Sequence, residues 1–528
     1  MRRTRTGRAL RRTGALLAAA LLLAGTAACG TDGDDGEGED HTYRSGTLRV
    51  LASSELADMK PVLDAAEKAT GVAVRPTYAG TLDAVEQVAS GKADAAYDAV
   101  WLSSNDYLRL RPEAGKRITA ETPVMTSPVA LGLRPEAVAR LGWDPAKVTW
   151  AQVHRAVADG RLGYGMTDPV RSNSGFSALV SIASGLSGAQ SALTDADVAR
   201  ATPRLKEFFA GQKLTSGSSG WLATAYARRS DVDALVNYES VLLSQPQRLT
   251  VVRPSDGVVT ADYPFTTLTA ARPEAKDAAR RLTSYLRGAE AQRLITEKTL
   301  RRPVVPGVKP AKAIAADARR ELPFPGSRSV ADGLLDAYEN RLRRPSRTVY
   351  VLDTSGSMSG ERLERLKKSL TELTEDFRDR EEVTLLPFGS SVKRDQVRTH
   401  RVDPKAPEKA LDAIRADAGR LSASGETAIY SSLQEAYEVL GKGDTGSAFT
   451  SIVLMTDGEN TAGVPASGFE DFYGKLPADR RSTPVFPILF GDSDRAELER
   501  IANLTGGRLF DATTGSLDGA FEEIRGYQ

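Results

Sequence analysis

The chain has 528 residues, of which 41% are hydrophobic and 26% are charged, and its formal net charge is +1. This length is enough for several folding units that each bury their own core. Without the six arginines of residues 1–28 the net charge is about −5, which argues against a nucleic-acid partner because phosphate binding needs clustered positive charge.

Residues 1–28 have the composition of an export signal. The arginines precede an apolar run, 15–24, and small residues then lead to Cys29, the single cysteine of the chain. The run is much shorter than the roughly 20 residues of a membrane-spanning helix. The segment TAACG at 26–30 resembles the bacterial lipobox, in which the cysteine becomes the lipidated N-terminus, although Thr26 stands where that family usually has an aliphatic residue. We expect a signal peptide over 1–28 and lipidation at Cys29; an ordinary cleaved signal is the alternative.

Residues 29–46 read as a tether. Their acidic, glycine-rich run TDGDDGEGED, at 31–40, cannot bury a core and suits a hydrated spacer. With lipidation, this predicts a chain anchored to the extracytoplasmic face of a membrane rather than spanning it. A single cysteine also excludes disulfides within the chain and any cysteine-based metal or redox site.

From residue 47 short apolar strands alternate with helices. Strands are predicted over 48–52, 72–78 and 99–102, and a helix over 61–70 ends before a glycine. This order predicts an α/β fold with an open, largely parallel sheet. The basic segment RLRRPS at 341–346 precedes a second unit in which the alternation begins again. We therefore expect one domain over 47–340 and another over 346–528.

The first domain resembles the extracellular solute-binding proteins of ABC transporters, nearest the sulfate and molybdate branch. That resemblance implies two lobes closing over a small solute, with the chain crossing between them near Ser127-Pro128 and returning near Tyr263-Pro264. It rests on dispersed segments: LASS at 51–54, DAVWLS at 98–103, GMTDP at 165–169, SNSG at 172–175, NYE at 237–239, AEAQRLI at 289–295 and RRP at 301–303.

Polar turns at the strand-to-helix junctions of this domain are the candidates for solute contact. Hydroxyls and free backbone N–H groups at helix starts suit an anion, so an oxyanion is a candidate solute, but Ser and Asn at such positions are also ordinary N-caps. Arg171 could donate to an oxyanion or could be a plain loop arginine. The predicted ligand-binding residues are Ser53, Ser54, Ser103, Ser172, Asn173, Ser174, Ser219 and Tyr238.

The second domain places polar residues at three strand ends or helix starts. Strand 348–352 runs into DTSGS at 353–357, and a helix follows with apolar residues on one face from Leu363 to Phe377. Thr427 opens a further predicted helix, and Asp457 ends strand 452–456. Open α/β sheets bind ligands at the carboxyl ends of their strands, so these side chains should converge.

Two carboxylates and three hydroxyls would make an all-oxygen site for a hard cation, which favours Mg²⁺, with Mn²⁺ or Ca²⁺ as substitutes. We expect the serines to bind directly, the threonine directly or through water, and the two aspartates largely through water. One coordination position then stays open for a carboxylate of a partner protein. The predicted ligands are Asp353, Ser355, Ser357, Thr427 and Asp457.

This set resembles the metal-ion-dependent adhesion site (MIDAS) of von Willebrand factor A (VWA) domains, over roughly 346–528. The later segments 485–491 and 498–507 are similar to that family as well. The resemblance implies a doubly wound, Rossmann-like fold and docking of an envelope or extracellular protein through the metal. A VWA fold whose site is intact but unused is the alternative.

No catalytic constellation is evident in the sequence. The three histidines, His41, His154 and His400, lack a nearby nucleophile and acid pattern, and no phosphate-binding or dinucleotide fingerprint occurs. We therefore expect a binding protein and not an enzyme. The alternative function is transport, as the substrate-binding lipoprotein of an ABC transporter with the VWA domain as a scaffold.

Overall fold

The computed structural model describes residues 46–316, 320–374, 377, 380–442, 448–491, 493–513 and 517–527. The predicted signal peptide, Cys29, His41 and all but the last residue of the predicted tether lie outside the described residues. Within the described part of the chain, no helix combines the length and apolarity needed to cross a bilayer.

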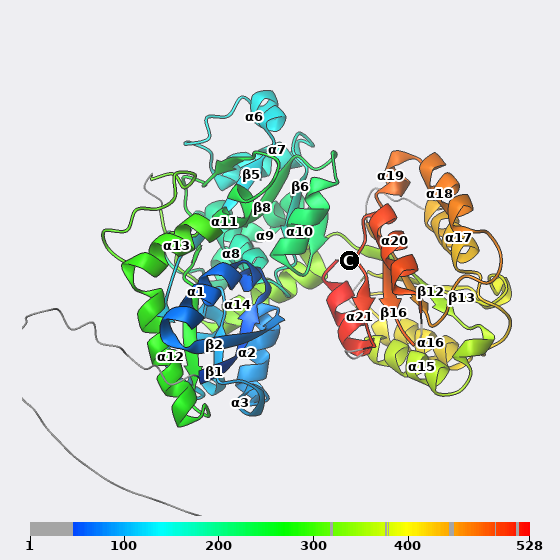
Figure 1. Cartoon of the computed structure of the whole chain (residues 1–528). Coiled ribbons are helices and arrows are strands. Elements are labelled where there is room, and N and C mark those ends of the chain that lie inside the picture. Colours follow the sequence, from blue (N-terminus) through cyan, green and yellow to red (C-terminus); the bar gives the residue numbers. More distant parts are fainter. Residues whose placement is uncertain are drawn as a thin grey trace, which may run out of the picture. The chain divides into compact units, whose positions relative to one another are not determined.

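A five-stranded sheet forms the first lobe of the N-terminal module (Figure 1). Strands β1, β2 and β3 are parallel, and β11 runs antiparallel between β3 and the edge strand β4. The strands in sheet order are β2 (Val72–Ala79), β1 (Gly46–Ser53), β3 (Ala99–Trp101), β11 (Pro264–Leu268) and β4 (Ile118–Pro123). The helical segments of this lobe are η1 (Ser54–Met59), α1 (Lys60–Thr70), α2 (Thr81–Ser90), α3 (Ala93–Ala96), α4 (Asp106–Arg109), α5 (Pro112–Gly115), α12 (Pro273–Leu286) and α13 (Ala289–Thr299).

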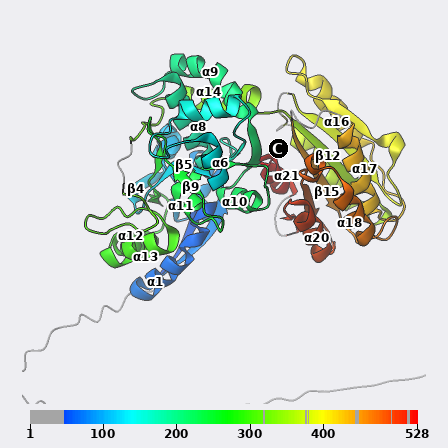
Figure 2. The ribbon, with the colours of Figure 1, turned by 90° about the horizontal axis from the view of Figure 1, so that it is seen from above.

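Local sequence explains how helix α1 begins and ends. Proline occupies its first turn, where the missing N–H costs nothing, and Gly71 ends it with φ 68°, a left-handed conformation that glycine adopts without strain. Helices α12 and α13, from late in the module, pack beside α1 (Figure 2). The first lobe is therefore built from two separate stretches of the chain.

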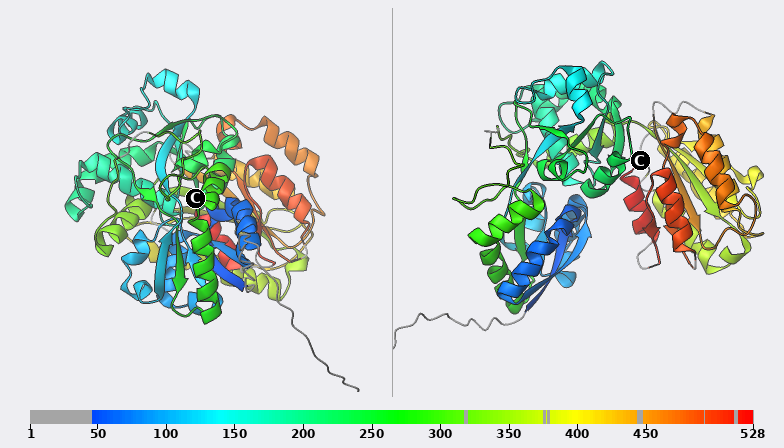
Figure 3. Two further views of the ribbon diagram at one scale, coloured as in Figure 1. Left: turned by 60° about the vertical axis from the view of Figure 1, so that its left-hand side comes forward. Right: turned by 45° about the horizontal axis from the view of Figure 1, so that its top comes forward.

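The second lobe has a mixed sheet of its own (Figure 3). The chain leaves the first sheet after β4 and returns to it at β11, so it crosses between lobes where the sequence predicted. The strands are β5 (Ser127–Leu133), β6 (Tyr164–Thr167), β7 (Gln212–Ser216), β8 (Ala234–Tyr238), β9 (Thr250–Val252) and β10 (Thr260–Ala261). The helices are α6 (Pro135–Leu141), α7 (Trp150–Ala158), α8 (Asn173–Ser187), α9 (Asp195–Ala210), α10 (Ser219–Ala227) and α11 (Glu239–Leu243).

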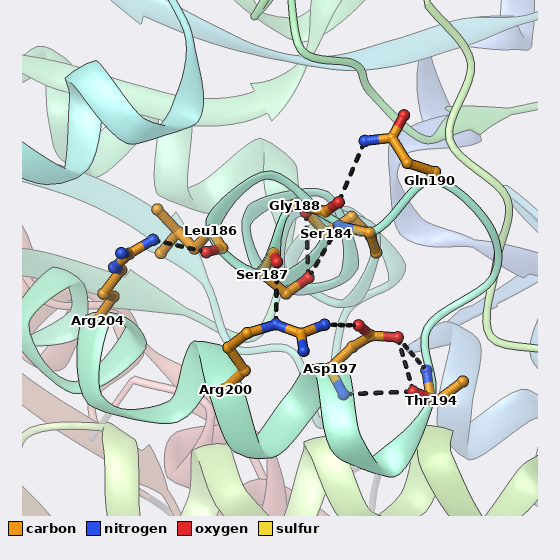
Figure 4. Close-up of polar contacts among 10 residues, drawn as sticks. Ser184, Leu186, Ser187, Gly188, Gln190, Thr194, Asp197, Arg200 and Arg204 are labelled. Carbon is orange, nitrogen blue, oxygen red and sulfur yellow. Dashed lines mark hydrogen bonds and ion pairs between the residues drawn. The ribbon is translucent and has the colours of Figure 1, made fainter.

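The connection between α8 and α9 is held by polar contacts at both helix ends (Figure 4). Thr194 and Asp197 form a capping box at the start of α9, in which each side chain bonds the other residue's backbone N–H. Arg200, paired with Asp197, donates through Nε to the carbonyl of Ser187 at 3.1 Å, and Arg204 donates to that of Leu186 at 2.9 Å. These arginines satisfy carbonyls at the C-terminal end of α8, which the helix itself leaves unpaired.

Helix α14 (Arg328–Ala337) continues into a π-helical turn, η2 (Tyr338–Leu342), and then into the second domain. The sheet there has order β14-β13-β12-β15-β16-β17, with β14 antiparallel and the others parallel. The central strands are continuous apolar runs, as expected for a sheet that is covered on both faces. The strands are β12 (Ser346–Asp353), β13 (Glu382–Phe388), β14 (Arg398–Arg401), β15 (Phe449–Thr456), β16 (Val485–Leu489) and β17 (Phe510–Asp511).

Helices cover both faces of this sheet. One apolar core contains residues of α15, α16 and α21, and a second contains residues of α17, α18 and α20. Helix α15 ends at Leu373, so Phe377 lies beyond it, in contrast to the predicted helical stripe, although its ring still packs near Tyr350. The helical segments are η3 (Gly356–Met358), α15 (Glu361–Leu373), η5 (Arg394–Gln396), α16 (Pro407–Gly419), α17 (Ile429–Gly441), α18 (Ala466–Lys475), α19 (Ala478–Arg481), α20 (Arg495–Thr505) and α21 (Leu517–Arg525).

A buried ion pair attaches the last helix to this domain. Arg525 donates to both carboxylate oxygens of Glu381, just before β13, at 2.7 and 2.6 Å. The two side chains are 1% and 4% exposed. The pair joins positions 144 residues apart, and the Arg525 guanidinium also lies over the ring of Phe377.

Candidate functional site

The predicted metal ligands come together at the carboxyl ends of β12 and β15. Asp353 is the last residue of β12, and Asp457 directly follows β15. Ser355 Oγ lies 2.9 Å from Ser357 Oγ, which donates to Asp457 Oδ1 at 2.8 Å. Four of the five predicted ligands are linked in this way or through the adjoining backbone, as the strand-end argument predicted.

Thr427 reaches the same place on a loop that approaches the end of β13 closely. Gly389, after β13, lies so near this loop that a Cβ there would be 2.3 Å from the Ser424 carbonyl oxygen, so the approach requires glycine. Ala428 N donates to the Gly389 carbonyl at 2.9 Å, and Thr427 Oγ1 would lie 3.7 Å from a Cβ at Gly458. Thr427 therefore faces the segment that carries Asp457.

Asp353 is fully buried and is held by neutral donors. Ser355 N donates to Oδ1 at 2.8 Å, and Thr456 Oγ1 donates to Oδ2 at 2.6 Å. Burial raises the pKa of Asp353, and the negative charge of Asp457 raises it further, while these hydrogen bonds oppose the shift. Lys393 donates to the Thr354 and Ser422 carbonyls at 3.0 and 2.7 Å rather than to this carboxylate.

This donor set fits a hard divalent cation. Its members are all oxygens, and the negative charge of Asp457 disfavours the ionised form of Asp353, which a cation would stabilise. Ser357 is exposed, whereas Asp353, Ser355, Thr427 and Asp457 are buried. Within the described residues no cluster of three or more His, Cys, Asp or Glu side chains forms, so hydroxyl oxygens have to complete any site here.

Two further side chains of this site were not predicted from the sequence. Thr456 donates a hydrogen bond to Asp353. The sequence feature that could have indicated this role is a polar residue at the end of an otherwise apolar strand. Arg362, in the first turn of α15, donates through Nη1 to Asp457 Oδ2 at 2.7 Å. The sequence feature that could have indicated this contact is a positive side chain at a helix N-terminus, because the helix dipole disfavours positive charge there unless an anion faces it.

In the solute module the predicted residues of the first lobe form a hydroxyl cluster. Ser53 Oγ lies 2.9 Å from Thr81 Oγ1 and accepts from Ser103 N at 3.1 Å, and Thr81 Oγ1 lies 3.3 Å from Ser103 Oγ. Ser54 opens η1, and no hydrogen bond between described residues joins it to this cluster. Thr81 was not predicted, because it begins helix α2 without a recognisable motif.

The second lobe carries a matching cluster. Ser174 Oγ lies 2.8 Å from Thr167 Oγ1, 3.1 Å from Ser172 Oγ and 2.7 Å from Ser219 Oγ. Ser172 precedes α8 without a side-chain capping bond, whereas Ser218 is a true N-cap that accepts from Trp221 N. The N-cap alternative therefore describes Ser218 but not Ser172.

Tyr238 and Asn173 belong to the second lobe and lie near the inter-lobe crossing. Asn173 Nδ2 donates to Tyr238 Oη at 2.9 Å, and the Tyr238 ring centroid is 6.0 Å from that of Tyr263. Arg171 lies 3.6 Å from Asp83 of the first lobe, so an ion pair across the lobes accounts for it.

Tyr263 marks the return crossing. It has φ 42°, unusual for a residue with a side chain, and its buried Oη has no hydrogen-bond partner among the described residues. The fully buried Arg301 guanidinium lies 4.8 Å from its ring centroid and donates to both oxygens of Asp58 at 2.8 and 2.7 Å. Burial also raises the pKa of Glu55, and the positive charge of Arg301 opposes this shift.

Each of the two histidines among the described residues lies within hydrogen-bond distance of a carboxylate. His154 Nε2 lies 2.8 Å from Glu207 Oε2, and His400 Nε2 lies 2.9 Å from Asp417 Oδ2. Among the described residues, no hydrogen bond links either histidine to a nucleophilic side chain, so neither forms a catalytic arrangement there.

Two family models match successive parts of the chain. Residues 48–300 match the bacterial extracellular solute-binding proteins, and residues 349–523 match the von Willebrand factor type A domain. The chain thus joins a solute-binding module to a VWA domain, and the predicted α/β class, a two-lobed module followed by a Rossmann-like domain, is confirmed. The first family implies a small solute ligand and an extracytoplasmic location.

Curated relatives cover a smaller part of the chain. Inter-alpha-trypsin inhibitor heavy chain H4 of Sus scrofa is 26% identical over 187 residues, 33% of this chain and 19% of that protein. Heavy chain H1 of Bos taurus is 28% identical over 200 residues, 36% and 21% of the respective chains. The chain spans about a fifth of the length of these relatives.

Solved structures are similar at low identity. The periplasmic binding protein AfuA from Actinobacillus pleuropneumoniae, with fructose-6-phosphate bound, is 13% identical, with 57% of this chain and 99% of that chain covered and a TM-score of 0.47. A von Willebrand factor type A protein from Catenulispora acidiphila is 19% identical, with 35% and 42% covered and a TM-score of 0.31.

Proposed function

We propose that this chain is a lipid-anchored extracytoplasmic binding protein whose VWA domain docks a partner protein through a divalent metal, while the N-terminal module binds a small solute. The observation that carries the proposal is the convergence of two buried carboxylates and three hydroxyls at one sheet edge. Because the donors are oxygens and the charge is negative, a hard cation is the ligand this chemistry favours.

Mg²⁺ at this position would supply a coordination site for a carboxylate of the partner. Asp353, Ser355, Ser357, Thr427 and Asp457 would hold the ion. Thr456 and the backbone N–H of Ser355 fix the orientation of the Asp353 carboxylate, and exposed Ser357 marks the side open to a partner. An acidic side chain suits this site because five side chains with two charges leave a divalent ion short of ligands.

Lipidation at Cys29 and the acidic tether would place both domains outside the membrane. In the solute module, hydroxyl clusters on both lobes support a small polar solute, with an oxyanion or a polyhydroxylated compound as candidates. The sulfate and molybdate branch rests on the sequence resemblance alone.

The test is a pull-down from solubilised cell envelopes with the mature chain lacking Cys29, in Mg²⁺ and then in chelator. Asp353→Ala is the inactive variant, and circular dichroism establishes that it folds. Thr348→Val is the matched control, since Thr348 bonds Ser451 at 3.1 Å near the start of the same strand.

Capture that requires both metal and Asp353 would establish metal-dependent docking and identify the partner. Equal capture by wild type and Asp353→Ala would contradict it, and the function would then rest on the solute module.

The second candidate function is transport, favoured by the match of residues 48–300 to solute-binding proteins. The chain would then deliver its solute to an ABC permease, with the VWA domain as a scaffold. Permease and ATPase genes beside this gene, together with loss of uptake on its deletion, would support transport; normal uptake in the deletion strain would contradict it.

A further inference from the structure

The Asp457 carboxylate is already engaged on both oxygens. Oδ1 accepts from Ser357 Oγ at 2.8 Å, and Oδ2 accepts from Arg362 Nη1 at 2.7 Å. The Asp457 side chain is fully buried, whereas that of Arg362 is 36% exposed. A cation belonging to the protein therefore occupies one of the two carboxylates proposed to hold the metal.

The fold makes room for this guanidinium. Gly491, after β16, has φ 63°, and a Cβ there would lie 3.3 Å from Arg362 Cζ and 3.0 Å from the Asp457 Cβ. Any side chain at 491 would crowd the contact between the guanidinium and the carboxylate. Arg362 also lies in the first turn of α15, where the helix dipole opposes a positive charge, and the contact with the Asp457 carboxylate offsets that cost.

We infer that Arg362 is an internal competitor of the divalent metal: it neutralises Asp457 when no metal is bound and weakens metal binding. The inference rests on the proposed metal site. A metal that uses Asp457 has to break the contact to Arg362 or share the carboxylate with it, and either arrangement costs free energy because two cations then lie close together.

The two carboxylates of the site thereby receive different roles. The described hydrogen bonds of Asp353 come from neutral donors, so that carboxylate can receive a cation without displacing one. Asp457 exchanges one cation for another. The site consequently holds metal less tightly than its oxygen set alone would allow, and a partner carboxylate that adds a ligand would strengthen retention.

The experiment is calorimetric titration of the full chain with Mg²⁺ and with Mn²⁺, comparing wild type, Arg362→Gln and Arg362→Lys. We expect Arg362→Gln to bind the metal about tenfold more tightly, since it removes the positive charge that contacts Asp457 Oδ2, in partly solvated surroundings. Arg362→Lys retains the charge and should stay within about threefold of wild type.

Arg365→Gln is the matched control. It removes the same charge from the same helix, but the Arg365 guanidinium lies 5.0 Å from the ring centroid of Phe490 instead of on Asp457. We expect its metal affinity to stay within about twofold of wild type. A second readout is the melting temperature without metal, which Arg362→Gln should lower because Asp457 loses its cation.

Equal affinity of wild type and Arg362→Gln, or weaker binding by Arg362→Gln, would overturn the inference and leave the metal site standing. No metal binding by wild type or by any variant would overturn the proposed metal site and this inference with it. Binding by Arg362→Gln alone would support the competition in its strongest form.

Discussion

Asp58 in the solute module and Asp353 in the VWA domain are two carboxylates with different exposure and different partners: the Asp58 side chain is 44% exposed, whereas Asp353 is fully buried. Burial raises the pKa of both. Asp58 is met by the Arg301 guanidinium at 2.8 and 2.7 Å, which opposes the shift. Asp353 accepts hydrogen bonds from the Ser355 backbone N–H and the Thr456 hydroxyl, and both of these donors are neutral.

The difference shows how to distinguish a structural carboxylate from one available to a ligand. Where the fold supplies a guanidinium, the charge is neutralised internally, and the pair stabilises the packing of two segments. Where it supplies neutral donors alone, the negative charge remains, and an external cation can lower its energy. Asp457 is intermediate, since its carboxylate accepts one hydrogen bond from a neutral hydroxyl and one from a charged guanidinium.

Arg301→Ala should give the largest effect. Arg301 is fully buried, and its loss removes the ion pair to Asp58, the bond to the Glu55 carbonyl at 3.2 Å and the contact with Tyr263. We expect the unfolding free energy of the solute module to fall by about 3 kcal/mol. Urea denaturation of the full chain measures it.

Arg109→Ala is the control for that change. Arg109 also pairs with two acids, Asp106 and Glu121, but is 44% exposed, so its removal should cost less than about 1 kcal/mol. Equal losses for both variants would show that burial does not distinguish these arginines.

Thr456→Val should weaken metal binding by about tenfold without a comparable loss of stability. The variant keeps the shape of the side chain but removes the 2.6 Å hydrogen bond that orients Asp353, and such supporting bonds typically contribute ten- to a hundredfold in affinity. Calorimetric titration with Mg²⁺ measures it. Affinity unchanged from wild type would mean that Asp353 needs no orienting donor.

Asp262→Asn should have the smallest effect, and one that depends on pH. Burial, helped by the charge of Asp106 and opposed by Arg109, raises the pKa of Asp262 from 3.8 to about 6. The folded state therefore keeps a proton that the unfolded state loses between about pH 4 and 6, so wild-type stability falls as pH rises through that window.

The asparagine variant has no such penalty. We expect it to be more stable than wild type by about 1 kcal/mol at pH 7.5 and equally stable at pH 4. Denaturant titrations at the two pH values measure this. An equal gain at both would assign the effect to packing instead of ionisation.

The convergence of the proposed metal ligands was more predictable from sequence than the arrangement of the proposed solute contacts, for a geometric reason. Asp353, Ser355 and Ser357 follow one strand, and parallel strands place Asp457 at the same edge, so local motifs and a single topological rule bring them together. Arg362 escaped prediction because its partner is 95 residues away and its position depends on the space left at Gly491.

The cleft depends on the pairing of two lobes. The predicted serines other than Ser54 do cluster. Thr81, which completes the first cluster, belongs to none of the segments that carry the resemblance, and Thr167, which completes the second, lies within GMTDP but was not predicted as a contact residue. Tyr263 was recognised as a crossing point, whereas its positive φ and partnerless hydroxyl follow from tertiary packing, which no local pattern encodes.

The buried pair of Glu381 and Arg525 has a consequence for how the VWA domain is made. Glu381 precedes β13, the strand next to the edge strand β14, and its counter-ion comes from α21, 144 residues later in the chain. Until that helix docks, the domain either leaves Glu381 in water or buries an uncompensated charge. We therefore expect folding of the domain to be completed only after α21 is synthesised: a nascent chain that lacks α21 should stay open around β13 and become protease-resistant once Arg525 can reach Glu381.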